Sequence, residues 1–240
     1  MSMKHELRKL LWRTGFDVSR FAPNSHSIAR TRQLLRSYGV DLVIDVGANV
    51  GQFAQQIRKD VGYSGKIVSF EPLSSAFQQL KQKQKEDPQW EVFNCALGDF
   101  EGKKGINIAG DSYSSSILTM LSSHINAAPE SRRIGREEIE IQMLDSIFNE
   151  ISSGHKHIYL KIDTEGFESK VIKGAEKSLK YIDTVQMEMS LTRLHEDECL
   201  FPELYSLMSG KGYSLISIEP EFSDKRTGQL LQIDGIFHRL

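Results

Sequence analysis

The sequence predicts an α/β domain in which a mostly parallel sheet carries helices on both faces. From residue 41 to the end of the chain, short apolar runs alternate with amphipathic segments, which is typical of successive β-α-β units. The chain has 240 residues, of which 39% are hydrophobic and 26% charged, a composition that allows a sizeable globular core. We therefore assign residues 39–240 to one domain and residues 1–38 to an N-terminal helical extension.

The N-terminal extension is basic and compatible with helix. Leu7, Leu10 and Leu11 are spaced to lie on one helical face. The Pro-Asn-Ser sequence at residues 23–25 indicates a break between two short helices. A basic amphipathic helix is also typical of segments that contact a membrane surface. We expect instead that this extension packs on the domain.

Within the domain, runs of strand length alternate with segments of helical periodicity. We expect strands at residues 41–46, 66–70, 90–96, 157–162, 184–189, 213–218 and 230–238, and helices at 50–60, 74–86, 165–180 and 202–211. The first helix, for example, places Val50, Phe53 and Ile57 on one face. The first strand is a short apolar run that ends in glycines, as expected for a strand buried in a parallel sheet.

The alternation is interrupted between residues 98 and 155. This interval is too long for one crossover connection and contains two further expected strands, at residues 105–108 and 138–143. Long insertions in compact domains are often functional loops. We expect this insertion to contribute to the substrate site.

Charge and cysteine content restrict the partners and the compartment. Thirty basic and 32 acidic residues give a formal net charge of -2, which does not favour nucleic acid as a partner. Cys95 and Cys199 are far apart, as in a reducing compartment. No apolar run approaches the roughly 20 residues that span a bilayer, and no signal peptide is evident. We expect a cytoplasmic protein without a membrane span.

A glycine-containing turn follows the first expected strand. Residues 45–51 read Asp45-Val-Gly47-Ala48-Asn49-Val-Gly51, and glycines here permit positive φ and close approach of the backbone to a ligand. The turn lacks the central glycine of the G-x-G-x-x-G fingerprint and the Gly-Lys-Ser/Thr of a P-loop. A ligand with an adenosine and no phosphate fits better, and Asp45 can accept a hydrogen bond from an ammonium group. S-adenosylmethionine has both features.

The next two strand ends carry further candidates for cofactor binding. Glu71 and Pro72 follow the second strand, where an acid can accept hydrogen bonds from both hydroxyls of a ribose. The same glutamate would also favour the dipole of the helix that follows. At the end of the third strand, backbone amides near Ala96 and Leu97 can bind the adenine. These positions predict a Rossmann-like nucleoside site.

Acids gather at the fourth and fifth strand ends. Asp163, Glu165 and Glu168 lie within one short segment, and Glu188 ends the next strand. Such acids are common in a first helical turn, but three of them exceed what capping requires. A carboxylate there can orient a hydroxyl or remove its proton. Our candidate catalytic residues are Asp163, Glu165, Glu188 and His195, in that order.

The sequence shows no strong metal signature. No set of His, Cys and acidic residues has a convincing metal-ligand spacing, so we predict no metal site. The alternative is that Asp163 and Glu188 recruit Mg²⁺ or Ca²⁺. A serine hydrolase is excluded because no Gly-x-Ser-x-Gly elbow is present.

These motifs together resemble the FkbM family of S-adenosylmethionine-dependent methyltransferases. The resemblance spans residues 41–238 and is most specific at residues 160–168, Leu-Lys-Ile-Asp-Thr-Glu-Gly-Phe-Glu. It implies a class I methyltransferase fold, with a seven-stranded sheet and an antiparallel last strand. It also implies methyl transfer to a hydroxyl of a sugar, glycan or polyketide-like acceptor. Thr164 and Phe167 depart from the usual residues of that motif, and Phe167 would narrow the substrate pocket.

Two other functions remain as alternatives. A nicotinamide-dependent oxidoreductase can use a similar fold, although the missing central glycine disfavours it. A non-catalytic protein could retain the S-adenosylmethionine turn, which the acids at Asp163 and Glu165 argue against. The sequence does not specify the methyl acceptor or the oligomeric state.

Overall fold

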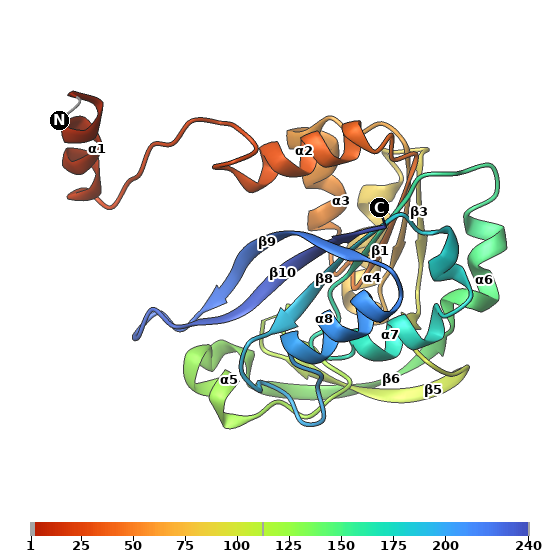
Figure 1. Ribbon diagram of the computed structural model, residues 1–240. Coiled ribbons are helices and arrows are strands. Elements are labelled where there is room, and N and C mark those ends of the chain that lie inside the picture. Colours follow the sequence, from red (N-terminus) through yellow and green to blue (C-terminus); the bar gives the residue numbers. More distant parts are fainter. Residues whose placement is uncertain (1–2, 112, 240) are drawn as a thin grey trace.

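The central feature of the computed structural model, which describes residues 3–111 and 113–239, is a seven-stranded sheet (Figure 1). In spatial order its strands are β3 (Trp90–Phe93), β2 (Lys66–Phe70), β1 (Leu42–Val46), β7 (Ile158–Ile162), β8 (Thr184–Ser190), β10 (Leu230–His238) and β9 (Ser214–Ser223). All are parallel except β10, which is antiparallel to both of its neighbours. This is the predicted class I methyltransferase sheet, with its antiparallel last strand.

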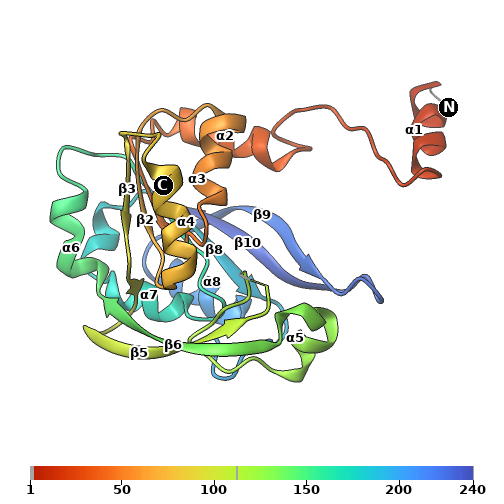
Figure 2. The same ribbon diagram turned by 180° about the vertical axis from the view of Figure 1, so that it is seen from behind.

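Helices cover both faces of this sheet, as the two opposite views show (Figures 1 and 2). On one face lie α3 (Gln52–Gln56), which continues as a π-helical turn over Ile57–Val61, and α4 (Ser74–Gln84). On the other face lie α6 (Leu144–Ile151), α7 (Glu168–Gly174) and α8 (Phe201–Gly210). Successive side chains of β1 point alternately into the two helical layers. Ile44 packs with the second group, whereas Val43 packs with the first.

A smaller sheet lies beside the main one. Its strands are β4 (Ala96–Leu97), β6 (Arg133–Gln142) and β5 (Gly102–Ala109), and α5 (Ser122–Ala127) and a 3-10 turn (Pro129–Ser131) connect β5 to β6. The expected strand at residues 90–96 is therefore wrong as one element. Asn94 turns the chain by donating hydrogen bonds to the carbonyls of Glu71 and Pro72, and Ala96 then pairs with Ile141 of β6.

The expected helix at residues 165–180 is also divided. Residues 163–167 form a turn, α7 ends at Gly174, and a separate 3-10 turn follows over Ser178–Tyr181. The expected strands at 105–108 and 138–143 are present but longer, as β5 and β6.

The two N-terminal helices differ in how they pack. α2 (Ser27–Ser37) lies on the domain: Leu35 is buried in the core, and Arg30 forms an ion pair with Glu219 of β9. α1 (Met3–Trp12) stands apart, joined by an extended segment (Figures 1 and 2). Leu10 of α1 is 57% exposed. The expectation that the extension packs on the domain is thus wrong for α1 and confirmed for α2.

None of the helices within residues 3–111 and 113–239 is long and apolar enough to cross a membrane.

The strand order reverses between β1 and β7. From β1 the chain proceeds outward to β2 and β3 on one side, and it returns to β7 on the other side. Ligands of open α/β sheets bind outside the carboxyl ends of the strands at such a switch point. The turns after β1, β2, β7 and β8 meet at this edge.

Gly174 tests the packing of α7 against the start of the insertion. A Cβ at this position would lie 1.7 Å from the Gly98 carbonyl oxygen, so the backbone of one element must move. We expect Gly174→Ala to lower the free energy of unfolding by about 3 kcal/mol, as measured by urea denaturation. Gly210→Ala, at the end of α8, is the matched control: a Cβ there would meet no neighbour within 4 Å in the described part of the chain, so the substitution should be neutral or slightly stabilising. Equal effects of the two substitutions would contradict this packing.

Candidate functional site

The turn after β1 brings the backbone of Gly47 against the strand end of β7. Gly47 has φ +82°, and a Cβ there would lie 1.8 Å from the carbonyl oxygen of Asp163. The N–H groups of Gly47 and Ala48 both donate to the Phe70 carbonyl at 3.0 Å. Glycine is therefore required at this position by conformation and by space. The turn is thus fixed to the ends of β2 and β7, the strands on either side of β1.

Glu71, at the end of β2, locks the same turn from the other side. Its two carboxylate oxygens accept hydrogen bonds from the backbone N–H groups of Asn49 and Leu73, each at 2.8 Å. Burial raises the pKa of the Glu71 carboxyl to about 7, although these two donors act in the opposite direction. A carboxylate has about four acceptor positions, so Glu71 can still accept hydrogen bonds from a ligand.

A small cavity of about 60 Å³ lies over this turn. The predicted cofactor residues that line it are Gly47, Asn49, Glu71, Pro72, Ala96 and Leu97. The structure thus brings together the ends of β1 and β2 with the start of β4. Asp45 and Gly51 lie elsewhere: Asp45 is fully buried below the turn, and a Cβ at Gly51 would meet Trp90.

The turn after β7 is held by one carboxylate oxygen. Oε1 of Glu168 accepts hydrogen bonds from the N–H and hydroxyl of Thr164, both at 2.9 Å, and from the N–H of Gly166 at 3.2 Å. Burial raises the pKa of Glu168 to about 7. Within this turn Glu165 has φ +53°, a left-handed conformation that is unfavourable for a residue with a Cβ. Glu168 therefore acts as a scaffold for the turn that presents Asp163 and Glu165.

Lys161 places a buried positive charge beside these acids. Its Nζ atom lies 2.8 Å from Oδ2 of Asp163, and its side chain is 9% exposed against 40% for Asp163. Burial acts to lower the pKa of Lys161, but Asp163, Asp45 and Asp234 together raise it above its ordinary value. The lysine is therefore charged at neutral pH and holds the Asp163 carboxylate in place.

A much larger cavity of about 1030 Å³ opens beside the small one. Five residues line both: Gly47, Asn49, Tyr113, Asp163 and Glu165. Its walls come from residues 24–31, the turn after β1, residues 111–130 of the insertion, and strands β8 to β10. Small-molecule sites typically enclose about 300–1,000 Å³. The large cavity is therefore large enough for a small molecule beside the small cavity.

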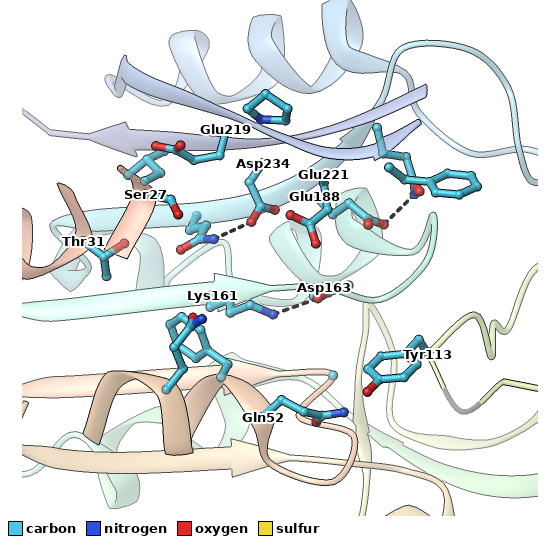
Figure 3. Close-up of a pocket in the computed structure, with 18 of the residues that line it drawn as sticks. Ser27, Thr31, Gln52, Tyr113, Lys161, Asp163, Glu188, Glu219, Glu221 and Asp234 are labelled. Atoms are coloured by element: carbon cyan, nitrogen blue, oxygen red, sulfur yellow. Dashed lines mark hydrogen bonds and ion pairs between the residues drawn. The ribbon is translucent and has the colours of Figure 1, made fainter. Parts of the chain in front are cut away.

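The large cavity is acidic. Among its described lining residues are eight Asp or Glu and three Lys or Arg. Figure 3 shows Glu188, Glu221 and Asp234 on one wall, facing Lys161 and Asp163. Burial, reinforced by Glu165 and Asp163, raises the pKa of Glu188 well above its ordinary value. Glu188 also accepts a hydrogen bond from Gln232 at 2.7 Å, so a fixed partner orients it.

His195, the fourth predicted catalytic residue, is fully buried and is not among the residues that line either cavity. It lies in the loop after β8, next to His124 of α5, with ring centroids 5.3 Å apart. Burial lowers the pKa of His124 to about 4, and the neighbouring His195 acts in the same direction. Of the two imidazoles, only His124 lines the large cavity.

The structure therefore joins three of the four predicted catalytic residues, Asp163, Glu165 and Glu188, in one cavity. Sequence reasoning missed His124 and Asp234, which no motif distinguishes. It also gave no role to Lys161, although a lysine inside the apolar strand at residues 158–162 is a detectable signal.

Comparison with known proteins identifies a family. Residues 45–215 match the Methyltransferase FkbM domain. No curated protein matches the chain. A similar solved structure is a methyltransferase FkbM from Methylobacillus flagellatus, with 15% identity and a TM-score of 0.49, where the match covers 82% of this chain and 43% of that one. An rRNA methylase from Streptococcus thermophilus has 10% identity and a TM-score of 0.49, with 90% of this chain and 98% of that one covered. TehB from Haemophilus influenzae has 9% identity and a TM-score of 0.49, with 90% of this chain and 64% of that one covered. This chain thus spans less than half the length of that FkbM chain. Likenesses at these values do not indicate a shared substrate.

The pH dependence of folding stability tests whether Glu168 is buried in the turn after β7. Its folded pKa of about 7 exceeds the ordinary 4.5, so its contribution to stability is full below pH 4.5 and is lost as pH rises through 7. Gln keeps the accepting Oε1 atom and does not titrate. We expect the unfolding free energy of the wild type, relative to Glu168→Gln, to fall by roughly 2–3 kcal/mol between pH 5 and pH 8. Urea denaturation at a series of pH values measures this, and a constant difference would contradict the assignment.

Proposed function

Because this chain belongs to the FkbM methyltransferase family, we propose that it transfers a methyl group from S-adenosylmethionine to a hydroxyl of a sugar, glycan or polyketide-like acceptor. The observation that carries this proposal is the junction of the two cavities. The small cavity has the residues expected around an adenosine, and the large one begins at Asp163 and Glu165. A cofactor over the turn and an acceptor in the large cavity would meet at these acids.

The residue types around the small cavity fit the adenosine of S-adenosylmethionine. Because this cavity has only about 60 Å³, the rest of the cofactor would extend into the adjoining large cavity. Glu71 retains acceptor positions for ribose hydroxyls, and Gly47 lets the turn below them pack against the Asp163 carbonyl, where a Cβ would lie only 1.8 Å away. Ala96 and Leu97 line the same cavity, where their backbone amides would bind the adenine. When bound, the sulfonium would supply an electrophilic methyl carbon: the acceptor oxygen bonds to that carbon while the carbon–sulfur bond breaks and its electron pair stays on sulfur.

Asp163 is the residue best placed to accept the hydroxyl proton. It is 40% exposed, lines both cavities and is oriented by Lys161 at 2.8 Å. Burial raises the pKa of Glu165 and of Glu188 well above ordinary values, which favours their protonated forms. Protonated Glu188 would hold a substrate oxygen rather than remove a proton. Positioning of this kind supplies much of the rate of a displacement reaction.

The charge of the large cavity supports a neutral acceptor. The described lining residues offer only three Lys or Arg as partners for a phosphate backbone, and those of the eight acids that are ionised would repel it. Carboxyl groups are good partners for the hydroxyls of a polyol. We therefore place saccharide-like and small-molecule acceptors ahead of RNA, and we propose no nucleic-acid partner.

Glu71→Ala tests the cofactor half of this proposal. Loss of the ribose hydrogen bonds should weaken S-adenosylhomocysteine binding by about 1–3 kcal/mol, or roughly 5- to 150-fold, in isothermal titration calorimetry. Glu91→Ala is the control, because Glu91 is an exposed glutamate on β3, remote from both cavities. An unchanged affinity in a folded Glu71→Ala protein would rule out the proposed ribose contact.

Asp163→Asn tests the transfer half. The wild type is incubated with S-adenosylmethionine and, separately, with neutral glycosides, polyketide-like alcohols and an RNA oligonucleotide, and product methylation is followed by mass spectrometry. We expect methylation within the neutral classes and a fall of about 10²–10⁴-fold in the variant, with S-adenosylhomocysteine binding retained. Asp183→Asn is the matched control, since Asp183 is 35% exposed and also pairs with a basic side chain. Methylation of RNA alone, or an active Asp163→Asn protein, would contradict the proposal.

A further inference from the structure

Three buried side chains converge beside the large cavity, and four of their polar atoms accept or donate no hydrogen bond within residues 3–111 and 113–239. His124, Glu165 and His195 each offer one ligand atom, and these atoms all lie within 4.8 Å of one another. The three residues are 3%, 9% and 0% exposed. Both ring nitrogens of His195, Nδ1 of His124 and Oε2 of Glu165 lack a hydrogen-bond partner within the described part of the chain. We infer that His124, Glu165 and His195 form a binding site for one divalent transition-metal ion.

Burial makes this arrangement unfavourable without a ligand. Polar side chains withdrawn from water lose free energy unless they are hydrogen-bonded or coordinate a metal. Four buried polar atoms without hydrogen bonds in one small cluster are unusual for a native core. One cation would interact favourably with an atom from each of the three residues.

The surrounding backbone directs these groups toward one another. Glu165 is held in its left-handed conformation, and Ser116 Oγ donates a 2.6 Å hydrogen bond to its carbonyl. Next to it, a Cβ at Gly166 would lie 3.4 Å from Cβ of His195. The loop that carries His195 also pairs with the segment before α5 through a bridge to Met120. Strain at one residue of a well-held turn is often associated with a functional site.

Glu198 adds a feature of many metal-binding histidines. Its Oε2 atom lies 3.8 Å from Nδ1 of His195, and its Oε1 atom accepts a hydrogen bond from the His195 N–H at 2.9 Å. A carboxylate beside one imidazole nitrogen orients the ring and makes the other nitrogen a better ligand. This leaves Nε2 of His195 for the metal.

The chemistry of the ligands indicates the class of metal. Two imidazoles and one carboxylate favour Zn²⁺, Mn²⁺ or Fe²⁺ over Mg²⁺ and Ca²⁺, which prefer oxygen ligands. Three protein ligands also leave coordination positions open. Because His124 and Glu165 line the large cavity, those positions are on the side of the acceptor.

The role of the ion rests on the function proposed above. A metal at this wall would bind the acceptor hydroxyl and lower its pKa, as metals do for bound water. The hydroxyl proton then passes to Asp163, the oxygen–carbon bond forms as the carbon–sulfur bond breaks, and the electron pair stays on sulfur. Metal binding itself requires only His124, Glu165 and His195, whatever reaction the protein catalyses.

Metal binding by the full chain tests the inference. The purified protein is stripped with a chelator, reloaded with Zn²⁺ and dialysed, and the metal is measured by mass spectrometry. Loading with Co²⁺ in parallel reports nitrogen and oxygen coordination through visible d–d absorption, without any mutation. We expect one Zn²⁺ per chain and a structured Co²⁺ spectrum. Absence of bound Zn²⁺ and Co²⁺ would overturn the site.

Variants then assign the ligands. His124→Gln, Glu165→Gln and His195→Gln should each weaken Zn²⁺ binding at least 100-fold, whereas His157→Gln, an exposed histidine paired with Asp183, should leave it unchanged. Retention of tight Zn²⁺ binding in the three variants would overturn the assignment. A far-UV circular dichroism spectrum and a cooperative urea transition like those of the metal-free wild type show that each variant is folded.

The same preparations separate this inference from the proposed function. If the stripped protein methylates its acceptor at the full rate and binds no Zn²⁺, the metal site is refuted and the methyltransferase stands. If Zn²⁺ binds through the three residues but S-adenosylhomocysteine does not bind, the metal site stands and the proposed function fails.

Discussion

The close approach of Gly47 to the Asp163 carbonyl is the constraint on which the rest of the site depends. No side chain fits between the turn after β1 and the end of β7, so the two strand ends are locked together. Glu71 fixes the same turn to the end of β2 through the Asn49 N–H. The small cavity and the acids at residues 163–165 therefore belong to one edge of the sheet. This is why the small and large cavities share residues.

Charge organises the large cavity around Lys161. The lysine lies among Asp45, Asp163 and Asp234, and these carboxylates keep it protonated in spite of burial. Burial keeps several other acids from ionising readily, including Glu165 and Glu188. The result is a wall in which Asp163 is paired with Lys161 and other hydrogen-bonding groups lie around it. Such a wall suits a hydroxyl that must be oriented and deprotonated.

Much of the fold was predictable because its signals are local. Apolar runs located the seven strands of the main sheet, and the glycine turn and Glu71 follow from residue type at a strand end. The sequence could not show that residues 90–96 divide between two sheets, because that depends on side-chain hydrogen bonds from Asn94 to distant carbonyls. Nor could it separate α1 from α2, since both have apolar residues at helical spacing.

The candidate site was predictable only in part. Asp163, Glu165 and Glu188 were recognisable from their positions at strand ends. The proximity of His124 and His195 to Glu165 was not, because the three residues come from an insertion, a turn and a loop that meet only in the folded chain. Spacing along the sequence predicted no metal site. Our inference of a metal at these three residues departs from that prediction on the basis of burial and geometry.

The most direct test of the central claim is calorimetric titration of the purified chain with S-adenosylhomocysteine and, separately, with NADH. The geometry of the turn and Glu71 predicts saturable binding of one S-adenosylhomocysteine per chain and no binding of NADH. Binding of NADH without S-adenosylhomocysteine would contradict the account and favour an oxidoreductase on the same fold.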